Sequence, residues 1–387
     1  MTTATPMTER HRAWATIDLN ALRKNLAMVR SHCPDSRIIP VIKANAYGHG
    51  MEMAARAMLE SHVPVAGFAV ATFAEAMTLC ELNLGVPVML LAGIRDSNEL
   101  RACMEHDIEL VVHAPYQVDI IRQAFSNEAL TRKPVLWLKH NSGMNRLGMA
   151  RETCLEVFKE LQGIPGVTMR LLSHLAYADD MEDGESRSFT NKQVGEFSAF
   201  CQQVRAAASD DVPASLAASA GILTLPVTHL EYVRPGVMLY GSSPLAGPTG
   251  EELGLQPVMT LQAALLAINE VKAGESVGYG ATYTCERDSR IGVVGIGYAD
   301  GYPRSAVNGT PVLVKTAGGN RRTRLIGRVA MDMITIDLTG MEDVTLDDTV
   351  VLWGRELCAD EVARSANTIA YELFCKVTGR VEFEYDG

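Results

Sequence analysis

The hydrophobic positions of this chain follow one pattern up to about residue 241 and a different pattern beyond it. In the first part, short apolar runs alternate with longer stretches in which apolar residues recur every three or four positions. Several short runs are rich in Val, Ile and Leu and are apolar on both faces, which is typical of parallel strands covered on each side. The eight runs are residues 38–43, 67–71, 87–92, 108–113, 134–140, 168–174, 214–219 and 232–241.

The stretches between these runs predict amphipathic helices. They include residues 51–61, 73–82, 115–125, 151–161 and 186–207. A further helix over residues 20–32 precedes the first run, with Asp18 or Asn20 as its N-cap. With a short helix after Ser219, helices and strands balance at eight each. The pattern therefore predicts an α/β domain, a (β/α)8 barrel of the TIM type.

Beyond residue 241 the pattern is that of a mostly antiparallel β-domain. Strand-like runs occupy residues 260–268, 291–297, 311–316, 324–329, 334–338 and 349–353. A helical stretch over 360–376 and a short strand over 380–385 complete it, and residues 318–320 have the composition of a hairpin turn. We therefore predict a barrel over 14–246 and a β-domain over 247–387, with residues 1–13 as an extension that can associate with the β-domain.

The composition of the chain limits which classes of molecule it is expected to bind. The 387 residues include 46 acidic and 35 basic ones, a formal net charge of -11, whereas binding to nucleic acid requires a basic face. No stretch approaches the roughly 18 apolar residues of a membrane span, and the polar N-terminus lacks a signal-peptide pattern. The eight cysteines are scattered, without metal-ligand spacing, which indicates free thiols and no metal site. We expect a cytoplasmic protein that binds neither nucleic acid nor membrane.

One lysine is expected to be partly buried, whereas most lysines are exposed to solvent. Lys43 ends the first apolar run and precedes a small-residue loop that carries Tyr47. A partly desolvated amine shifts to a lower pKa and becomes nucleophilic, which a Schiff-base lysine requires. This position predicts a lysine that binds pyridoxal 5'-phosphate.

Other unusual polar residues also end predicted strands. Lys139 ends the fifth run, His174 the sixth and Ser219 the seventh, while Arg234 lies within the eighth. Catalytic groups of (β/α)8 barrels project from the carboxyl ends of the strands. The placement supports both the barrel and a site at that end.

Six segments carry a resemblance to a known family. They are residues 41–50 (VIKANAYGHG), 138–148 (LKHNSGMNRLG), 233–241 (VRPGVMLYG), 278–282 (GYGAT), 297–302 (GYADGY) and 327–332 (GRVAMD). In this order they resemble the motifs of the alanine racemase family, and the resemblance extends from Trp14 to Val381. It implies interconversion of L- and D-alanine with pyridoxal phosphate, to supply D-alanine for peptidoglycan.

The resemblance implies two catalytic residues. Lys43 matches the lysine that binds the cofactor and, once freed, serves one face of the substrate. Tyr279 matches the acid–base group of the opposite face. A phenol, with a reference pKa near 10, needs nearby positive charge to act as a base, and Arg146 is a plausible source. In the family this tyrosine comes from the other subunit, so a homodimer is implied.

The resemblance also implies a set of residues around the cofactor. Arg234 matches the residue that faces the pyridine nitrogen, and an arginine leaves that nitrogen unprotonated because it does not give up its proton. His174 matches the histidine that packs on the ring and bonds this arginine, with a backbone-satisfied buried histidine as its alternative. The phosphate ligands implied are Tyr47, Ser219, Gly236, Val237 and Tyr371.

For the substrate, the family pattern assigns the carboxylate to the Met331 amide and to Arg146, which also lies near the cofactor. The entrance is implied to include Tyr298 and Asp332 beside Tyr279 and Tyr371, a narrow gate that favours a small amino acid.

The pattern also matches Lys139 to a lysine that is often carbamylated, whose added carboxylate would neutralise and orient Arg146. Two positions depart from a common version of the pattern, with Asn141 where many members have Asp and Ala218 where some have Asn.

Three other functions remain open on the sequence alone. A racemase of broader specificity is the first, although such relatives tend to carry secretion signals and paired cysteines. A non-catalytic pyridoxal phosphate carrier is the second, but such proteins lack the β-domain. A decarboxylase of similar architecture is the third, and its Gly-rich phosphate loop and β-domain cysteine or aspartate motif are not found here.

Overall fold

The structure, a computed structural model, describes residues 11–126 and 134–387. Its internal contacts divide the chain into two compact units. The first, here called the barrel unit, comprises the described residues within Arg23–Leu239 and Pro244–Pro248. The second, the β-unit, comprises the described residues within Met1–Leu22, together with Tyr240–Ser243 and Thr249–Gly387.

The barrel unit contains eight parallel strands in the order β2-β9-β8-β7-β6-β5-β4-β3. Backbone hydrogen bonds from Ala66 to Ile38 (2.7 Å) and from Ala69 to Pro40 (2.9 Å) join the two outer strands, so the sheet closes. The predicted barrel is thus confirmed. Its strands are β2 (Arg37–Ile38), β3 (Phe68–Val70), β4 (Val88–Leu90), β5 (Glu109–Val112), β6 (Val135–Lys139), β7 (Thr168–Leu172), β8 (Ala214–Ala218) and β9 (Tyr232–Arg234).

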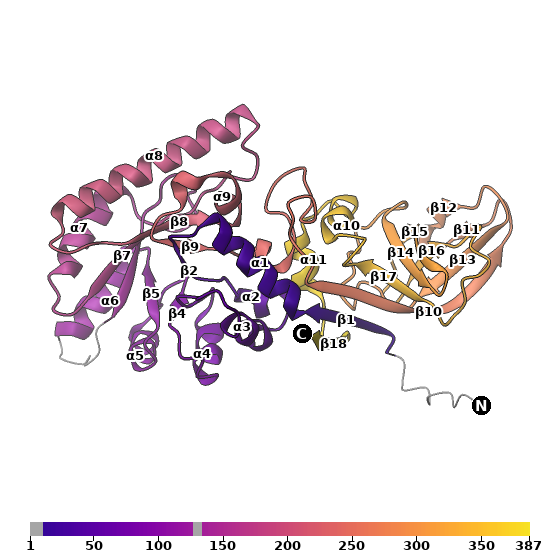
Figure 1. Cartoon of the computed structure of the whole chain (residues 1–387), viewed down its shortest axis with the longest axis horizontal. Helices are drawn as coiled ribbons and strands as arrows, with labels where there is room; N and C mark the ends of the chain where they lie inside the picture. Colours follow the sequence, from indigo (N-terminus) through magenta and orange to yellow (C-terminus); the bar gives the residue numbers. More distant parts are fainter. Residues whose placement is uncertain (1–10, 127–133) are drawn as a thin grey trace. The chain divides into compact units, whose positions relative to one another are not determined.

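Helices cover the outside of these strands (Figure 1). They are α1 (Leu19–His32), α3 (Met51–Leu59), α4 (Phe73–Glu81), α5 (Ser97–Glu105), α6 (Pro115–Ser126), α7 (Arg151–Gln162), α8 (Gly184–Ala207) and α9 (Ser219–Thr224). The unit also contains the short turn α2 (Lys43–Tyr47), which is left-handed, and the 3-10 turns η1 (Pro226–Thr228) and η2 (Val237–Tyr240). Of the two predicted caps, Asp18 caps α1 by accepting a hydrogen bond from the Ala21 amide (2.8 Å). None of the described helices is long and apolar enough to span a membrane.

The β-unit is built on an eight-stranded sheet in the order β13-β16-β15-β14-β17-β10-β1-β18, with β10 also paired to β13. The strands are β1 (Ala13–Asp18), β10 (Met259–Val271), β13 (Ser289–Val294), β14 (Pro311–Thr316), β15 (Gly319–Ile326), β16 (Ile334–Asp337), β17 (Thr349–Trp353) and β18 (Glu382–Asp386). A two-stranded sheet of β11 (Ser276–Val277) and β12 (Tyr283–Thr284) flanks the 3-10 turn η3 (Tyr279–Ala281).

The helical stretch predicted over 360–376 is two helices, α10 (Ala359–Ser365) and α11 (Ala370–Lys376). The break falls at Asn367, whose φ of 53° is left-handed and cannot continue a right-handed helix. All eight cysteines lie in the described residues and are free, as predicted.

Strand β1 belongs to the β-unit, whereas the barrel was predicted to begin at residue 14. It pairs antiparallel with β10 and parallel with β18, and the indigo and yellow strands lie side by side in Figure 1. Ala13, Ala15 and Ile17 point into the core of this unit and are buried. The reason for the difference is that both pairing partners lie more than 200 residues away along the chain.

Candidate functional site

The predicted strand-end residues lie at one end of the barrel. Lys139 is the last residue of β6, Arg234 is the last of β9, and Ser219 directly follows β8. His174 lies two residues after β7. Lys43 follows Ile42, whose amide bonds the Ala69 carbonyl of β3 (3.0 Å). Because parallel strands share their carboxyl end, these five residues lie at the same end of the barrel.

The loop after Lys43 is a left-handed turn. Ala44, Asn45, Ala46 and Tyr47 have φ of 50°, 54°, 55° and 53°, and each such L-residue costs roughly 1–2 kcal/mol. A run of strained residues persists only where its surroundings hold it, and such runs concentrate at functional sites.

Three side chains hold this turn. Glu75 of α4 accepts a hydrogen bond from the Ala44 amide (2.7 Å), and Asn45 accepts one from the Met51 amide (2.8 Å). The His49 ring lies 3.1 Å from the Ala46 carbonyl and 2.9 Å from the Tyr47 carbonyl. Burial lowers the pKa of His49 to about 4, so this ring is neutral at neutral pH. The turn thereby fixes the backbone positions from which the Lys43 and Tyr47 side chains extend.

Arg234 is 4% exposed and binds only neutral acceptors in the described part of the chain. Its guanidinium donates to the Ser215 hydroxyl, to the Ser173 carbonyl (2.7 Å) and to the Leu216 carbonyl (3.2 Å). Burial lowers the pKa of Arg234 to about 9, so it remains charged at neutral pH. The family pattern pairs this arginine with His174, but among the described residues the His174 ring makes no hydrogen bond with it.

Positive charge accumulates at this end of the barrel. Burial, reinforced by Arg234, Arg146 and Lys43, lowers the pKa of Lys139 to about 8. Burial, together with these same cations and Lys139, lowers the pKa of His174 to about 3 and keeps its imidazole neutral. Each charged group that shifts these two pKa values is a cation, so this end of the barrel favours anionic ligands.

A small cradle lies beside this cluster. The Ser219 hydroxyl accepts hydrogen bonds from the amides of Gly236 (2.9 Å) and Met238 (3.4 Å). A Cβ added at Gly236 would lie 2.8 Å from the Tyr47 hydroxyl and 3.9 Å from the Ser219 hydroxyl. Two hydroxyls and a glycine backbone therefore converge, as a phosphate group requires. Val237 follows directly in η2.

Asn141 shapes the exposed loop that carries Arg146. Its side-chain oxygen accepts hydrogen bonds from the amides of Gly143 (3.1 Å) and Asn145 (3.0 Å), and its amino group donates to the Asn145 side chain (2.9 Å). An aspartate could make the first two bonds but could not donate the third. The departure from the family pattern thus adds one side-chain hydrogen bond within this loop.

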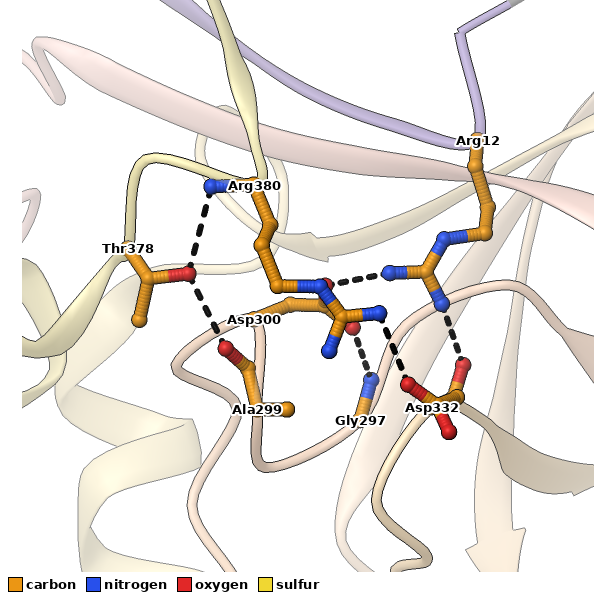
Figure 2. Close-up of polar contacts among 7 residues, drawn as sticks. All are labelled: Arg12, Gly297, Ala299, Asp300, Asp332, Thr378 and Arg380. Atoms are coloured by element: carbon orange, nitrogen blue, oxygen red, sulfur yellow. Dashed lines mark hydrogen bonds and ion pairs between the residues drawn. The ribbon is translucent and has the colours of Figure 1, made fainter.

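The remaining predicted site residues belong to the β-unit: Tyr279, Tyr298, Met331, Asp332 and Tyr371. Tyr279 begins η3 and is 72% exposed, and the Met331 side chain is 53% exposed. Asp332 is bound by Arg380 (2.7 Å), and Figure 2 shows the polar contacts around it.

Three supporting residues were not foreseen from the sequence: Ser215, Glu75 and Arg380. A serine within the apolar strand β8 was a visible signal, because buried polar groups need partners. Glu75 and Arg380 gave no signal, since a helix-start glutamate and a surface arginine are ordinary.

Comparison with known proteins agrees with both units. The family model described as the alanine racemase N-terminal domain matches residues 17–244, and the model described as the C-terminal domain matches 258–385. An alanine racemase of Vibrio parahaemolyticus is 43% identical over 378 residues, which cover 96% of this chain and 99% of the relative.

Solved structures extend the comparison. The biosynthetic alanine racemase of Pseudomonas aeruginosa has a TM-score of 0.89 at 40% identity, covering 98% of this chain and 100% of that one. The alanine racemase of Streptomyces lavendulae has a TM-score of 0.87 at 34% identity, covering 98% of each chain. By sequence, by domain composition and by fold, this chain belongs to the alanine racemase family.

Proposed function

We propose that this chain interconverts L-alanine and D-alanine, with pyridoxal 5'-phosphate bound through Lys43, and so supplies D-alanine for peptidoglycan. The observation that carries the proposal is the arrangement of Lys43, Lys139, His174 and Arg234 around one end of the barrel. The enzyme would work as a homodimer, and a cytoplasmic location stays a prediction.

The residues present fit pyridoxal phosphate. The cradle of Tyr47, Ser219 and Gly236 offers two hydroxyls for the phosphate, beside the Gly236 amide that donates to the Ser219 hydroxyl. Val237 and Tyr371 would complete it by the family pattern. His174 would pack on the ring, and neutral His174 adds no charge there. When bound, the cofactor withdraws electrons and acidifies the Cα–H of an amino acid.

Arg234 would set the electronic character of the site. Its guanidinium is held by the Ser215 hydroxyl and by two backbone carbonyls, none of which can take its proton. Because it stays protonated at neutral pH, it can only donate a hydrogen bond to a ring nitrogen and cannot supply a proton to it. This limits how strongly the ring withdraws electrons and favours simple proton exchange over side reactions.

Racemisation needs a proton acceptor on one face of the substrate and a donor on the other. The Lys43 amine would exchange a proton at Cα on one face. The Tyr279 hydroxyl of the partner subunit would exchange one on the opposite face. Arg146 and the Met331 amide would bind the carboxylate and keep Cα between them, while Tyr298 and Asp332 would line the entrance.

The decisive experiment is chiral analysis of products from a panel of L-amino acids, with pyridoxal phosphate added. We expect D-alanine from L-alanine and little product from larger amino acids. Equal rates with serine or larger substrates would instead indicate a racemase of broader specificity. No D-product from any substrate would refute the proposed function.

Two variants assign the catalytic residues. Lys43→Ala should lose the visible absorbance of lysine-bound cofactor and all racemisation. Tyr279→Ala should keep that absorbance and lose proton removal from L-alanine, because only one face keeps its acid–base group. Fast exchange in both directions by Tyr279→Ala would contradict its assignment.

A further inference from the structure

Two segments of the β-unit, residues 297–301 and 330–333, lie backbone against backbone. The Tyr298 amide donates to the Ala330 carbonyl (3.0 Å), and the Ala299 amide donates to the Met331 carbonyl (3.0 Å). A Cβ on Gly297 would lie 2.4 Å from both of these carbonyl oxygens, so only glycine permits this approach. The Ala330 amide in turn donates to the Met333 carbonyl (3.0 Å).

A layer of charged side chains fixes the two segments from one side (Figure 2). Asp300 is fully buried, and its carboxylate accepts hydrogen bonds from the Gly297 amide (2.8 Å) and from Arg12. The Arg380 Nε lies 3.3 Å from the same carboxylate. A buried carboxylate with two arginines and a backbone amide has its charge compensated, which makes such a network rigid.

Both arginines also bind Asp332, each at a different point. Arg12 donates to its backbone carbonyl (2.7 Å), and Arg380 donates to its carboxylate (2.7 Å). Gly295 makes room for this contact, because a Cβ there would lie 2.6 Å from the Arg12 Cγ. The residue that follows Met331 is therefore held through its backbone and through its side chain.

The Met331 amide is the next backbone group of this segment to consider. The carbonyls of residues 330, 331 and 332 all accept hydrogen bonds, yet within the described residues the Met331 amide donates none. A donor whose neighbouring peptide groups are all fixed is preorganised, and it can bind an anion without a cost of reorganisation.

We propose that Arg12, Asp300 and Arg380 form a positioning network that presents the Met331 amide to the carboxylate of the amino-acid substrate. The network has a second effect, since Arg380 neutralises the Asp332 carboxylate, which would otherwise repel a substrate carboxylate at the entrance. This inference rests on the proposed function, in which Met331 binds the substrate. None of the three network residues touches the reacting atoms.

The test is the split between KM and kcat in Arg380→Ala. Loss of the arginine frees the Asp332 side chain and leaves its charge uncompensated, which weakens binding of substrate and transition state alike. We expect the KM for L-alanine to rise roughly tenfold with kcat nearly unchanged. The inhibition constant of propionate, a carboxylate without the amine, should rise in parallel, and the absorbance of the bound cofactor should not change.

Arg321→Ala is the matched control, because Arg321 pairs with Asp343 in the same unit at the surface. Its KM and propionate inhibition should equal those of the unaltered enzyme. Arg380→Lys keeps the positive charge but lacks the planar guanidinium with its several N–H donors, and it should give an intermediate KM. An unchanged KM, or a fall in kcat alone, in Arg380→Ala would overturn the inference.

If Arg380→Ala fails to fold in a thermal melt, Arg380→Lys decides the matter, and an unchanged KM in that variant overturns the inference. The failure of the proposed function is a separate outcome, seen as an unaltered enzyme that does not racemise alanine. The failure of this inference is seen as an active enzyme whose KM for L-alanine does not change when Arg380 is substituted.

Discussion

At the scale of single residues, the chemistry of the barrel depends on cations that lie close enough to shift one another's pKa. Lys139 shows the consequence most clearly, because burial and three neighbouring cations lower its pKa to about 8. Above that pH the amine is mostly neutral, and a neutral amine can attack carbon dioxide. A new N–C bond forms, a proton leaves, and the resulting carbamate carries a negative charge toward Arg146. We propose this modification of Lys139.

The modification predicts a dependence on carbon dioxide. Enzyme depleted of carbon dioxide should lose activity several-fold, and bicarbonate should restore it faster at pH 8 than at pH 6, where Lys139 is protonated, when both samples are set to the same concentration of dissolved carbon dioxide. Rate measurements with and without bicarbonate, with intact mass under non-acidic conditions, check this. Lys139→Ala should not respond to bicarbonate, and an equal response would show that another group is involved.

The phosphate cradle gives a second prediction at this scale. Gly236→Ala places a Cβ 2.8 Å from the Tyr47 hydroxyl, so the phenol must move. Overpacking of this kind costs about 1–3 kcal/mol, and the Kd for pyridoxal phosphate should rise roughly tenfold. Fluorescence titration measures it. Gly195→Ala in α8, where an added Cβ meets nothing within 4 Å, is the control and should leave the Kd unchanged.

At the scale of elements, the left-handed turn after Lys43 is the part under most strain. Glu75 serves it and the start of α4 together, accepting from the Ala44 amide (2.7 Å) and from the amides of Ala71 and Thr72 (2.9 Å each). One carboxylate thus ties the cofactor lysine's loop to the helix after β3. Removing it releases three amides and the constraint on the turn.

We predict that Glu75→Ala weakens cofactor binding as well as stability. A hydrogen bond to a charged group contributes about 1.5–3 kcal/mol, so the Kd for pyridoxal phosphate should rise roughly tenfold, with a lower Tm. Glu99→Ala is the matched control, because Glu99 holds the start of α5 through the Arg95 amide (2.8 Å) and does not contact the turn. It should lower Tm alone. Equal Kd values for pyridoxal phosphate in the two variants would show that Glu75 does not support cofactor binding.

The prediction of elements from sequence succeeded where periodicity alone decides. The parallel strands were foreseen because they are apolar on both faces, and the long helix α8 because its apolar positions recur at helical spacing. The turn at Ala44–Tyr47 was not foreseen, because four left-handed residues without glycine contradict local preference. Strand β1 was missed because its partners, β10 and β18, are distant in the chain.

At the scale of the whole molecule, the proposed activity divides its catalytic residues between the two units. Lys43 belongs to the barrel unit and Tyr279 to the β-unit. Tyr279 is 72% exposed, which suits a residue that meets a second subunit. A homodimer in which each active site combines both units from different chains has a testable consequence.

Mixing of two inactive variants should restore activity. In dimers of Lys43→Ala with Tyr279→Ala, one of the two sites contains both an intact lysine and an intact tyrosine. Random exchange of subunits should then give about a quarter of the activity of the unaltered enzyme. Racemisation assays after mixing and renaturation check this. A mixture as inactive as its components would place Tyr279 in the same chain's site.

The sequence by itself determined the barrel, the β-domain and the candidate residues at the strand ends, because hydrophobic periodicity and motif order are local properties of the chain. Only the tertiary structure decided what holds those residues. Ser215 behind Arg234, Glu75 beneath Ala44, and Arg12 with Arg380 on Asp300 join residues from 19 to 288 positions apart. Such contacts exist only after folding brings distant strands together, and the spacing of hydrophobic residues along the chain does not predict them.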